Sequence, residues 1–222
     1  MIIVETPVGQ ERNSRMRFFV SDTHFGHANI IKYSNRPFKD INHMNEVLIK
    51  NWNETVGPDD TVYHLGDLAL GDKSSWEGIF SRLNGYKVLI VGNHDAVFMG
   101  NKENYRDKYR HLYESFDEIH DNLQGLWLED GTIVNLSHFP YESDHTEEAR
   151  YMEYRLVDRG RILIHGHTHS EFDKHGMDSR VSKSRRGSLQ IHVGMDAWGY
   201  RPVSEDEVLG LIDAGMPQEN HM

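Results

Sequence analysis

Aspartate, histidine and asparagine residues gather in five short segments of this 222-residue sequence. Each segment follows a short apolar run in which a β-strand is expected, and in three of them a glycine directly precedes a candidate metal ligand. The segments are SDTHFGH at 21–27, HLGD at 64–67, VGNHD at 91–95, SHFP at 137–140 and HGHTH at 165–169. Loops at strand ends converge to form the sites of layered α/β proteins, so we expect the five segments to meet at one place.

The spacing within these segments is suited to metal binding. Asp22 and His24 lie two residues apart, so in an extended chain their side chains share a face and could chelate one ion. Asp67 follows a glycine, which lets the backbone turn sharply while the carboxylate reaches each of two ions. The predicted nitrogen and oxygen ligands are Asp22, His24, Asp67, Asn93, His138, His167 and His169. This set is large enough for two divalent ions that share one carboxylate.

Two neighbouring ions would direct the chemistry toward phosphate esters. Ions about 3.5–4 Å apart can clamp a phosphate, stabilise both the attacking and the leaving oxygen, and generate hydroxide near neutral pH. The expected nucleophile is a hydroxide that bridges the ions, so no Ser or Cys nucleophile is required. The chain has no cysteine, so its metal ligands must be imidazole and oxygen groups. A lone Asp-x-His pair is more often a surface or core feature, but five such segments in order favour a site.

The motifs resemble those of the calcineurin-like metallophosphoesterase superfamily, without a substitution. They are Asp22-x-His24, Gly66-Asp67, Gly92-Asn93-His94-Asp95, His138 and Gly166-His167-x-His169. The resemblance extends from Phe18 to about Pro202, and residues 21–38 and 192–204 are similar to a compact bacterial and phage subgroup of phosphoesterases. It implies an α/β fold, namely a four-layer α/β/β/α sandwich of the metallo-dependent phosphatase type.

The resemblance also implies a role for each residue of the site. One ion would be held by Asp22, His24, Asp67 and His169, and the other by Asp67, Asn93, His138 and His167. His94 is similar to the family's histidine that contacts the phosphate and protonates the leaving oxygen. Asp95 would orient His94 by accepting a hydrogen bond from its far ring nitrogen.

The resemblance favours a phosphodiesterase for a small substrate, because members of the wider group cleave aryl phosphodiesters and 2′,3′-cyclic nucleotides. A phosphomonoesterase, a protein phosphatase and a nuclease for DNA or RNA ends are alternatives on the same fold. A catalytically silent metal-binding scaffold is the alternative from another class, and the intact ligand set weighs against it. Sites of this kind accept Mn, Fe, Co, Ni or Zn, and we expect two divalent ions, with Mn favoured.

Three residues near the motifs are candidates for substrate contacts. His27 could meet a substrate phosphate, or it could cap or pack the helix that follows. Asn29 is a candidate contact, whereas Arg36 is expected to be solvated at the surface. Trp198 could present an aromatic face to a nucleobase, although packing explains it equally well.

Four further residues are expected to support the site rather than to bind ions. His64 and His165 precede the ligand segments and are predicted to lie in the core or behind the ligands. Asp196 and Tyr200 could form part of the wall of the site.

The pattern of apolar residues predicts a layered α/β domain from Met16 onward. Strands are predicted at 17–21, 61–65, 87–91, 119–123, 126–128, 132–137, 161–164 and 189–193. Helices are predicted at 41–56, 74–83, 102–112, 146–157 and 205–211, and in the first of these Met44, Val47, Leu48 and Trp52 form a stripe at helical spacing. Ser204 followed by Glu207 is typical of a capped helix start.

The composition of the chain limits the classes of partner that it is expected to bind. The chain carries 35 acidic and 24 basic residues, a net charge of −11, which argues against general affinity for nucleic acid. The expected partner is a small phosphoester, with no stable nucleic-acid binding. Apolar runs are too short to cross a membrane and no secretory signal is evident, so no membrane partner and a cytoplasmic location are expected. The oligomeric state stays open.

The chain is predicted to hold one phosphoesterase domain at 16–222. Residues 1–15 are interpreted either as a flexible extension or as residues upstream of a true start at Met16. The polar, basic segment 170–188 is predicted to be a solvated loop, with a mobile flap over a phosphate site as the alternative.

Overall fold

The first of two β-sheets is mainly parallel. The computed structural model describes residues 15–142, 144, 150–169 and 180–215. In this sheet a short antiparallel edge strand lies beside four parallel strands. Their order is β10 (Val203–Ser204), β1 (Arg17–Val20), β2 (Thr61–His64), β3 (Tyr86–Ile90) and β4 (Glu118–His120).

The second sheet has three parallel strands between two antiparallel edge strands. Their order is β5 (Asn122–Trp127), β6 (Ile133–Ser137), β7 (Ile162–His165), β9 (Leu189–His192) and β8 (Val181–Lys183). The two sheets are joined by an isolated bridge between Ser21, which follows β1, and Gly194, which follows β9. The carboxyl ends of parallel strands from both sheets therefore lie close together.

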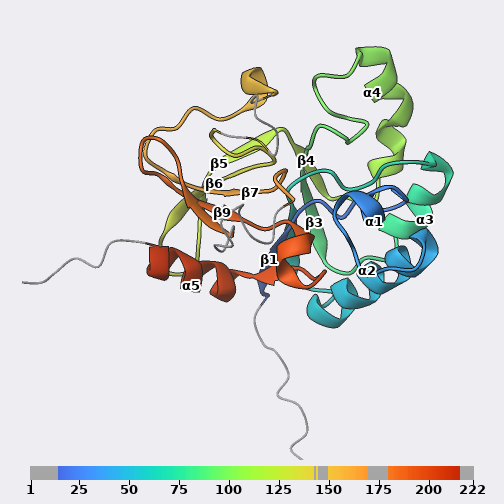
Figure 1. Ribbon diagram of the computed structural model, residues 1–222, viewed down its shortest axis with the longest axis horizontal. Coiled ribbons are helices and arrows are strands. Elements are labelled where there is room, and N and C mark those ends of the chain that lie inside the picture. The colour runs from blue at the N-terminus through green and yellow to red at the C-terminus, as the bar shows by residue number, and fades with distance from the viewer. Residues whose placement is uncertain (1–14, 143, 145–149, 170–179, 216–222) are drawn as a thin grey trace, which may run out of the picture.

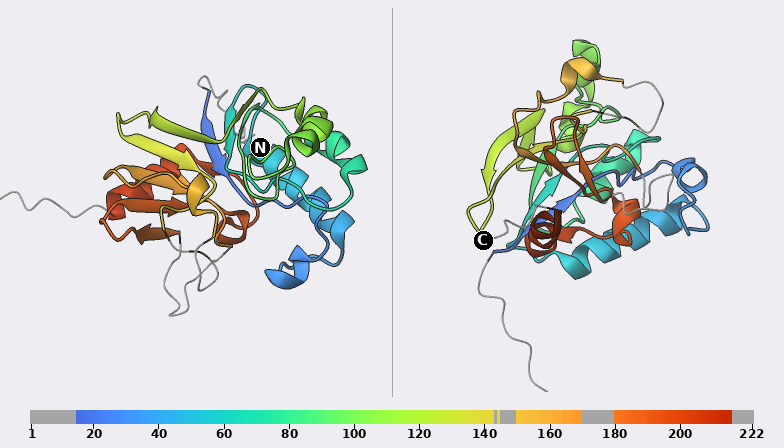
Figure 2. Two further views of the ribbon diagram at one scale, coloured as in Figure 1. Left: turned by 90° about the horizontal axis from the view of Figure 1, so that it is seen from above. Right: turned by 60° about the vertical axis from the view of Figure 1, so that its left-hand side comes forward.

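Helices cover the first sheet on the side away from the second sheet, as Figures 1 and 2 show. They are α1 (Ile30–Tyr33), α2 (Ile41–Thr55), α3 (Trp76–Phe80) and α4 (Glu103–Tyr109), together with the 3₁₀ turns η1 (Lys73–Ser75) and η2 (Arg110–Tyr113). Helix α2 begins where the side chain of Asp40 accepts a hydrogen bond from the backbone N–H of His43. Helix α5 (Glu205–Gly215) begins with the predicted cap, since Ser204 and Glu207 bond each other's backbone N–H groups, and it contacts β9, β10 and β1.

Two apolar cores explain why the first sheet is apolar on both faces. On the helical side, Met44, Leu48 and Trp52 of the predicted stripe on α2 are fully buried, and Val47 is partly buried against the same core. On the other side, residues such as Phe19 of β1 and Ile164 of β7 pack between the sheets. Two packed sheets with flanking helices confirm the predicted α/β sandwich.

Most predicted elements are present with shifted ends. The helices expected at 74–83 and 102–112 are shorter and are each completed by a 3₁₀ turn. Two short edge strands, β8 and β10, were not predicted, because three and two residues are too few to show an alternating pattern. Since β8 lies within segment 170–188, the prediction of a loop is wrong for that part, and residues 170–179 lie outside the described residues.

The helix predicted at 146–157 is wrong for the residues that the structure describes. Residues 150–157 contain only the 3₁₀ turn η3 (Met152–Tyr154). Tyr151 has a left-handed backbone with φ of 57°, and Arg155 is extended, so neither continues a helix. The aromatic ring of Tyr151 instead stacks against Phe139 at a centroid distance of 5.3 Å. Tertiary packing overrides the local helical pattern here.

Two other expectations concern the chain as a whole. The extension predicted at 1–15 falls outside the described residues except for Arg15. Within the described part of the chain, every helix is too short or too polar to cross a lipid bilayer.

Candidate functional site

The candidate ligands lie in loops that follow β1, β2, β3, β6 and β7, at the edge where both sheets end. Five of them have positive φ, a conformation that costs energy for residues other than glycine and persists only where the surroundings enforce it. These residues are Asp22 (58°), His24 (51°), Asp67 (55°), His167 (73°) and His169 (54°). The same sharp turns that strain the backbone aim these side chains at a common centre.

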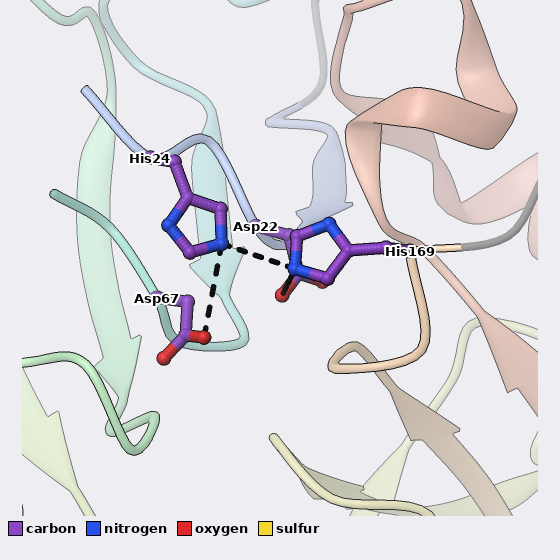
Figure 3. Close-up of side chains that lie close together, drawn as sticks. All are labelled: Asp22, His24, Asp67 and His169. Carbon is purple, nitrogen blue, oxygen red and sulfur yellow. Dashed lines mark hydrogen bonds and ion pairs between the residues drawn. The ribbon is translucent and has the colours of Figure 1, made fainter. Parts of the chain in front are cut away.

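The first ligand group consists of Asp22, His24, Asp67 and His169, whose potential ligand atoms all lie within 4.8 Å of one another. In Figure 3 the two imidazoles face each other, and their Nε2 atoms are 3.1 Å apart. His24 Nε2 lies 3.8 Å from Asp67 Oδ2, and His169 Nε2 lies 3.6 Å from Asp22 Oδ1. One ion could contact all four side chains.

The second ligand group consists of Asp67, His138 and His167, also within 4.8 Å of one another, with Asn93 beside them. His138 Nε2 lies 3.5 Å from Asp67 Oδ2, 3.2 Å from His167 Nδ1 and 3.2 Å from Asn93 Oδ1. Asp67 thus belongs to both groups. The structure brings together all seven residues that the sequence predicted as ligands.

Close approach of two loops places Asp67 between the groups. A Cβ added to Gly66 would lie only 2.5 Å from the backbone nitrogen of Gly92, so these loops can meet only because both residues are glycine. Asp67 Oδ1 then accepts a hydrogen bond of 2.8 Å from the backbone N–H of His94, which leaves Oδ2 facing the imidazoles.

The donor set fits a pair of divalent cations. Asp22 Oδ1 is buried without a hydrogen-bond partner among the described residues, which is costly for a carboxylate unless a cation compensates it. The imidazoles are oriented from behind: His138 Nδ1 lies 2.8 Å from the Leu65 carbonyl oxygen, and His169 Nδ1 lies 3.2 Å from Asp196 Oδ2. Each of these contacts leaves Nε2 free to bind an ion.

Protonation in the metal-free protein reflects the same crowding. Burial alone favours a neutral imidazole, but the Asp67 carboxylate raises the pKa of His138 to about 9. Burial and the neighbouring His138 lower the pKa of His167 to about 3. Burial raises the pKa of Asp22. Despite burial, His138 and His24 hold the pKa of Asp67 well below its usual value. Protons and imidazolium charge thus compensate the buried carboxylates that a cation would otherwise neutralise.

Comparison with known proteins identifies the family. The signature of the calcineurin-like phosphoesterases matches residues 18–171, which include all seven candidate ligands. This chain belongs to that family.

Several proteins are similar to this chain over most of its length. The Gene 66 protein of Mycobacterium phage L5 is 39% identical over 203 residues, covering 88% of this chain and 93% of the relative. The uncharacterized protein MJ1445 of Methanocaldococcus jannaschii is 32% identical, covering 90% and 93% of the two chains. The crystal structure of AQ665 from Aquifex aeolicus, a protein of unknown function, is 31% identical with a TM-score of 0.65, covering 89% of this chain and 100% of that one.

His94, for which the family resemblance implies an acid, lies on the open side of the site. Its side chain is 45% exposed, and its Nε2 lies 4.0 Å from Asp67 Oδ2. The prediction that Asp95 orients His94 is wrong for this structure: among the described residues no hydrogen bond joins them. The buried Asp95 carboxylate instead accepts from the backbone N–H groups of Asp67, Leu68 and Gly92. Asp95 therefore fixes the loop that carries the shared ligand.

The prediction that Arg36 is solvated is also wrong. Its side chain is fully buried and donates two hydrogen bonds, of 2.8 and 2.9 Å, to the carboxylate of Asp196. It also donates to the backbone carbonyl oxygens of Asp22 and Thr23. Arg36 and Asp196 thus form a chain to His169 behind the first ligand group, a more specific role for Asp196 than a wall. A polar pattern on either side of Arg36 gave no signal of this burial.

The three candidate residues for substrate contact lie in different environments. Trp198 packs in the core between the sheets, and its indole N–H donates to the His192 carbonyl oxygen, so the nucleobase prediction is wrong. His27 is half-buried, with its ring 5.3 Å from that of His24. Asn29 is exposed and its side chain does not cap α1. Substrate contact by His27 or Asn29 stays a prediction.

The two supporting histidines are buried as expected. His64 Nε2 lies 3.0 Å from the Thr23 hydroxyl, and its ring stacks on Trp52. Burial lowers the pKa of His64 to about 3 and that of His165 to about 4, so both are neutral near pH 7. Two residues were missed: Asp144, which contacts His167, and Arg155, which contacts Asp144. No motif surrounds them, so only the fold shows their position.

Proposed function

We propose that this protein is a metal-dependent phosphodiesterase for small substrates, with 2′,3′-cyclic nucleotides as a candidate class. The observation that carries the proposal is the shared carboxylate: Asp67 Oδ2 lies 3.8 Å from His24 Nε2 and 3.5 Å from His138 Nε2. A carboxylate between two groups of imidazole ligands can bridge two ions. Mn²⁺ is our choice of ion, since the carboxylate and amide oxygens of the ligand set suit it.

Two bound cations would supply Lewis-acid polarisation of the phosphoryl group and a water nucleophile of lowered pKa. The chain supplies orientation and proton transfer. Asp95 and the glycines of the two loops hold Asp67, and the backbone N–H of His94 bonds the same carboxylate. The His94 main chain is therefore fixed beside the site, while its exposed imidazole can reach a leaving oxygen and donate a proton to it.

One feature supports a small over a polymeric substrate, and another supports a diester over a monoester. The net charge of −11 repels long nucleic acids, whose binding depends on clustered cationic side chains. The imidazole of His94, which we expect to protonate the leaving group, is on the solvent side of the ligands, where the second ester group of a diester could extend outward.

A substrate panel tests this proposal. Purified protein with Mn²⁺ should turn over bis(4-nitrophenyl) phosphate and 2′,3′-cyclic AMP faster than 4-nitrophenyl phosphate, and a chelator should abolish all three activities. A strong preference for the monoester would contradict the proposed diesterase activity and indicate a phosphomonoesterase. Labelled oligonucleotides would expose a nuclease. Metal-loaded protein without activity on any ester would instead indicate a binding scaffold.

The role of His94 is tested by leaving groups. His94→Ala should reduce kcat about 10²–10⁴-fold for an alkoxide leaving group, and far less for 4-nitrophenolate, which needs little protonation. The matched control is His111→Ala, which removes an exposed imidazole on η2 and should leave both rates unchanged. Equal losses for both leaving groups would contradict general-acid catalysis by His94.

A further inference from the structure

The far ring nitrogen of His167 meets a buried carboxylate from outside the family motifs. His167 Nε2 lies 3.0 Å from Asp144 Oδ1, and the side chains of both residues are at most 2% exposed. Asp144 lies in the segment between β6 and β7, 23 residues away along the chain. A contact this short between buried groups fixes both of them.

Asp144 is itself held in place. Arg155 donates from Nη2 to Asp144 Oδ2 at 3.1 Å, and the backbone N–H of Arg150 donates to the same oxygen at 3.1 Å. Arg155 also donates to the carbonyl oxygens of Pro140 and Arg150. The arginine therefore ties together both ends of the segment that presents Asp144.

This contact determines which nitrogen of His167 carries the proton. A carboxylate accepts a hydrogen bond, so Asp144 favours the tautomer of His167 that carries its proton on Nε2. The lone pair then lies on Nδ1, the atom 3.2 Å from His138 Nε2 and inside the second ligand group. His138 and His169 are oriented with Nε2 toward the centre, so His167 is the ligand that needs the opposite tautomer.

We propose that Asp144 is a positioning residue for the second ion, holding His167 with Nδ1 directed at that ion while Arg155 fixes Asp144. The inference rests on the proposed pair of ions. Asp196 provides an internal comparison, because it makes the corresponding contact with His169 in the first ligand group and is held by Arg36. Each ion thus has its own Arg–Asp–His chain.

Titration with Mn²⁺ alone tests this inference without reference to activity. We expect the wild-type protein to bind two Mn²⁺ and to give the EPR signature of a coupled pair. Asp144→Ala should lower the affinity for the second Mn²⁺ about 10–100-fold. At limiting Mn²⁺ the spectrum of this variant should therefore be that of an isolated ion. Arg155 keeps its carbonyl acceptors in this variant, so the fold should be retained, which circular dichroism would check.

Two controls make the result specific. Glu142→Gln removes a carboxylate from the same segment that pairs with the exposed Arg185, and it should leave both ions bound. The second control is a double-mutant cycle. If Asp144 acts through His167, Asp144→Ala should cause no further loss of Mn²⁺ affinity in a His167→Ala background. Asp144→Asn, a smaller change, should give an intermediate loss and serves if the alanine variant does not fold.

The outcomes separate the two proposals. Wild-type protein that binds fewer than two Mn²⁺ would overturn the proposed function together with this inference. Two Mn²⁺ in the wild type with unchanged affinity in Asp144→Ala would overturn the inference alone. Equal additional losses with and without His167 would also overturn it, because they would show a general structural effect rather than action through His167.

Discussion

The two ligand groups share Asp67 but are built on different parts of the molecule. The first is supported by Arg36 and Asp196, whose side chains are at most 4% exposed. The second is supported by Asp144 and Arg155, from a segment whose described residues form only one 3₁₀ turn. The first support thus joins distant parts of the chain, since Arg36 lies in the loop after α1 and Asp196 lies 160 residues away in the 3₁₀ turn η4 (Met195–Trp198), whereas Asp144 and Arg155 are only 11 residues apart.

The groups also differ in charge. The first has a carboxylate of its own, Asp22, in addition to the shared Asp67. The second adds the imidazoles of His138 and His167 and the neutral amide of Asn93. Because carboxylates contribute most of the attraction for a divalent cation, we expect the first group to bind its ion more tightly. The difference suggests that ions bind in sequence.

Asp67→Ala should have the largest effect, because it removes the one side chain on which both groups depend. We expect loss of both ions and a fall in kcat/KM of at least about 1,000-fold, or about 4 kcal/mol of transition-state stabilisation. Elemental analysis and hydrolysis of bis(4-nitrophenyl) phosphate would measure this. Retention of one tightly bound ion would show that the first group does not need the shared carboxylate.

Arg36→Met and Arg155→Met compare the two supports directly. Removing Arg36 should lower the free energy of unfolding by about 3–5 kcal/mol, because Asp196 is left buried without its guanidinium partner. Removing Arg155 should cost less, about 1–3 kcal/mol, because Asp144 keeps its contacts with Arg150. Urea unfolding in the presence of a chelator measures both. Equal losses would contradict a difference in support.

The affinity of the second ligand group for Mn²⁺ should depend on pH. Binding an ion must remove the proton that Asp67 holds on His138, whose pKa is raised to about 9. Affinity for the second Mn²⁺ should therefore increase up to about tenfold per pH unit between pH 7 and 9. Calorimetry in buffers of different ionisation enthalpy should show release of about one proton. Affinity independent of pH in this range would mean that His138 is already neutral.

The raised pKa of His138 has the opposite effect on the stability of the metal-free protein, which should decrease as the pH rises. The folded state binds the His138 proton more tightly than the unfolded state, so this contribution to stability is complete below about pH 6.5. It is lost as the pH rises to about 9. Chelator-treated protein should accordingly lose stability toward alkaline pH, whereas the Mn²⁺-loaded protein should not.

Asn29→Ala should have the smallest effect and provides the baseline for both groups. Its side chain is exposed at the start of α1 and does not cap the helix. We expect Mn²⁺ affinity and unfolding free energy to change by no more than about 0.5 kcal/mol. A large rise in KM without a change in metal content would reveal a substrate contact at this position.

The sequence alone determined the fold class and the candidate ligands. Apolar strand patterns and short motifs such as Asp22-x-His24 are local, and the chemistry of their side chains limits what they can do. The Asp67 prediction likewise needed only its neighbouring glycine. Local pattern was misleading at 146–157, where aromatic packing of Tyr151 overrides helical periodicity.

Only the tertiary structure decided which residues support the ligands. Arg36 and Asp196 are 160 residues apart, and an arginine that will be buried beside a carboxylate has no local mark that separates it from a solvated one. Asp144 and Asp95 gave equally little indication of their partners. The reason is physical: metal ligands recur in short motifs because the chain must turn locally to aim them. Their supports need only reach the right point in space, from any part of the chain.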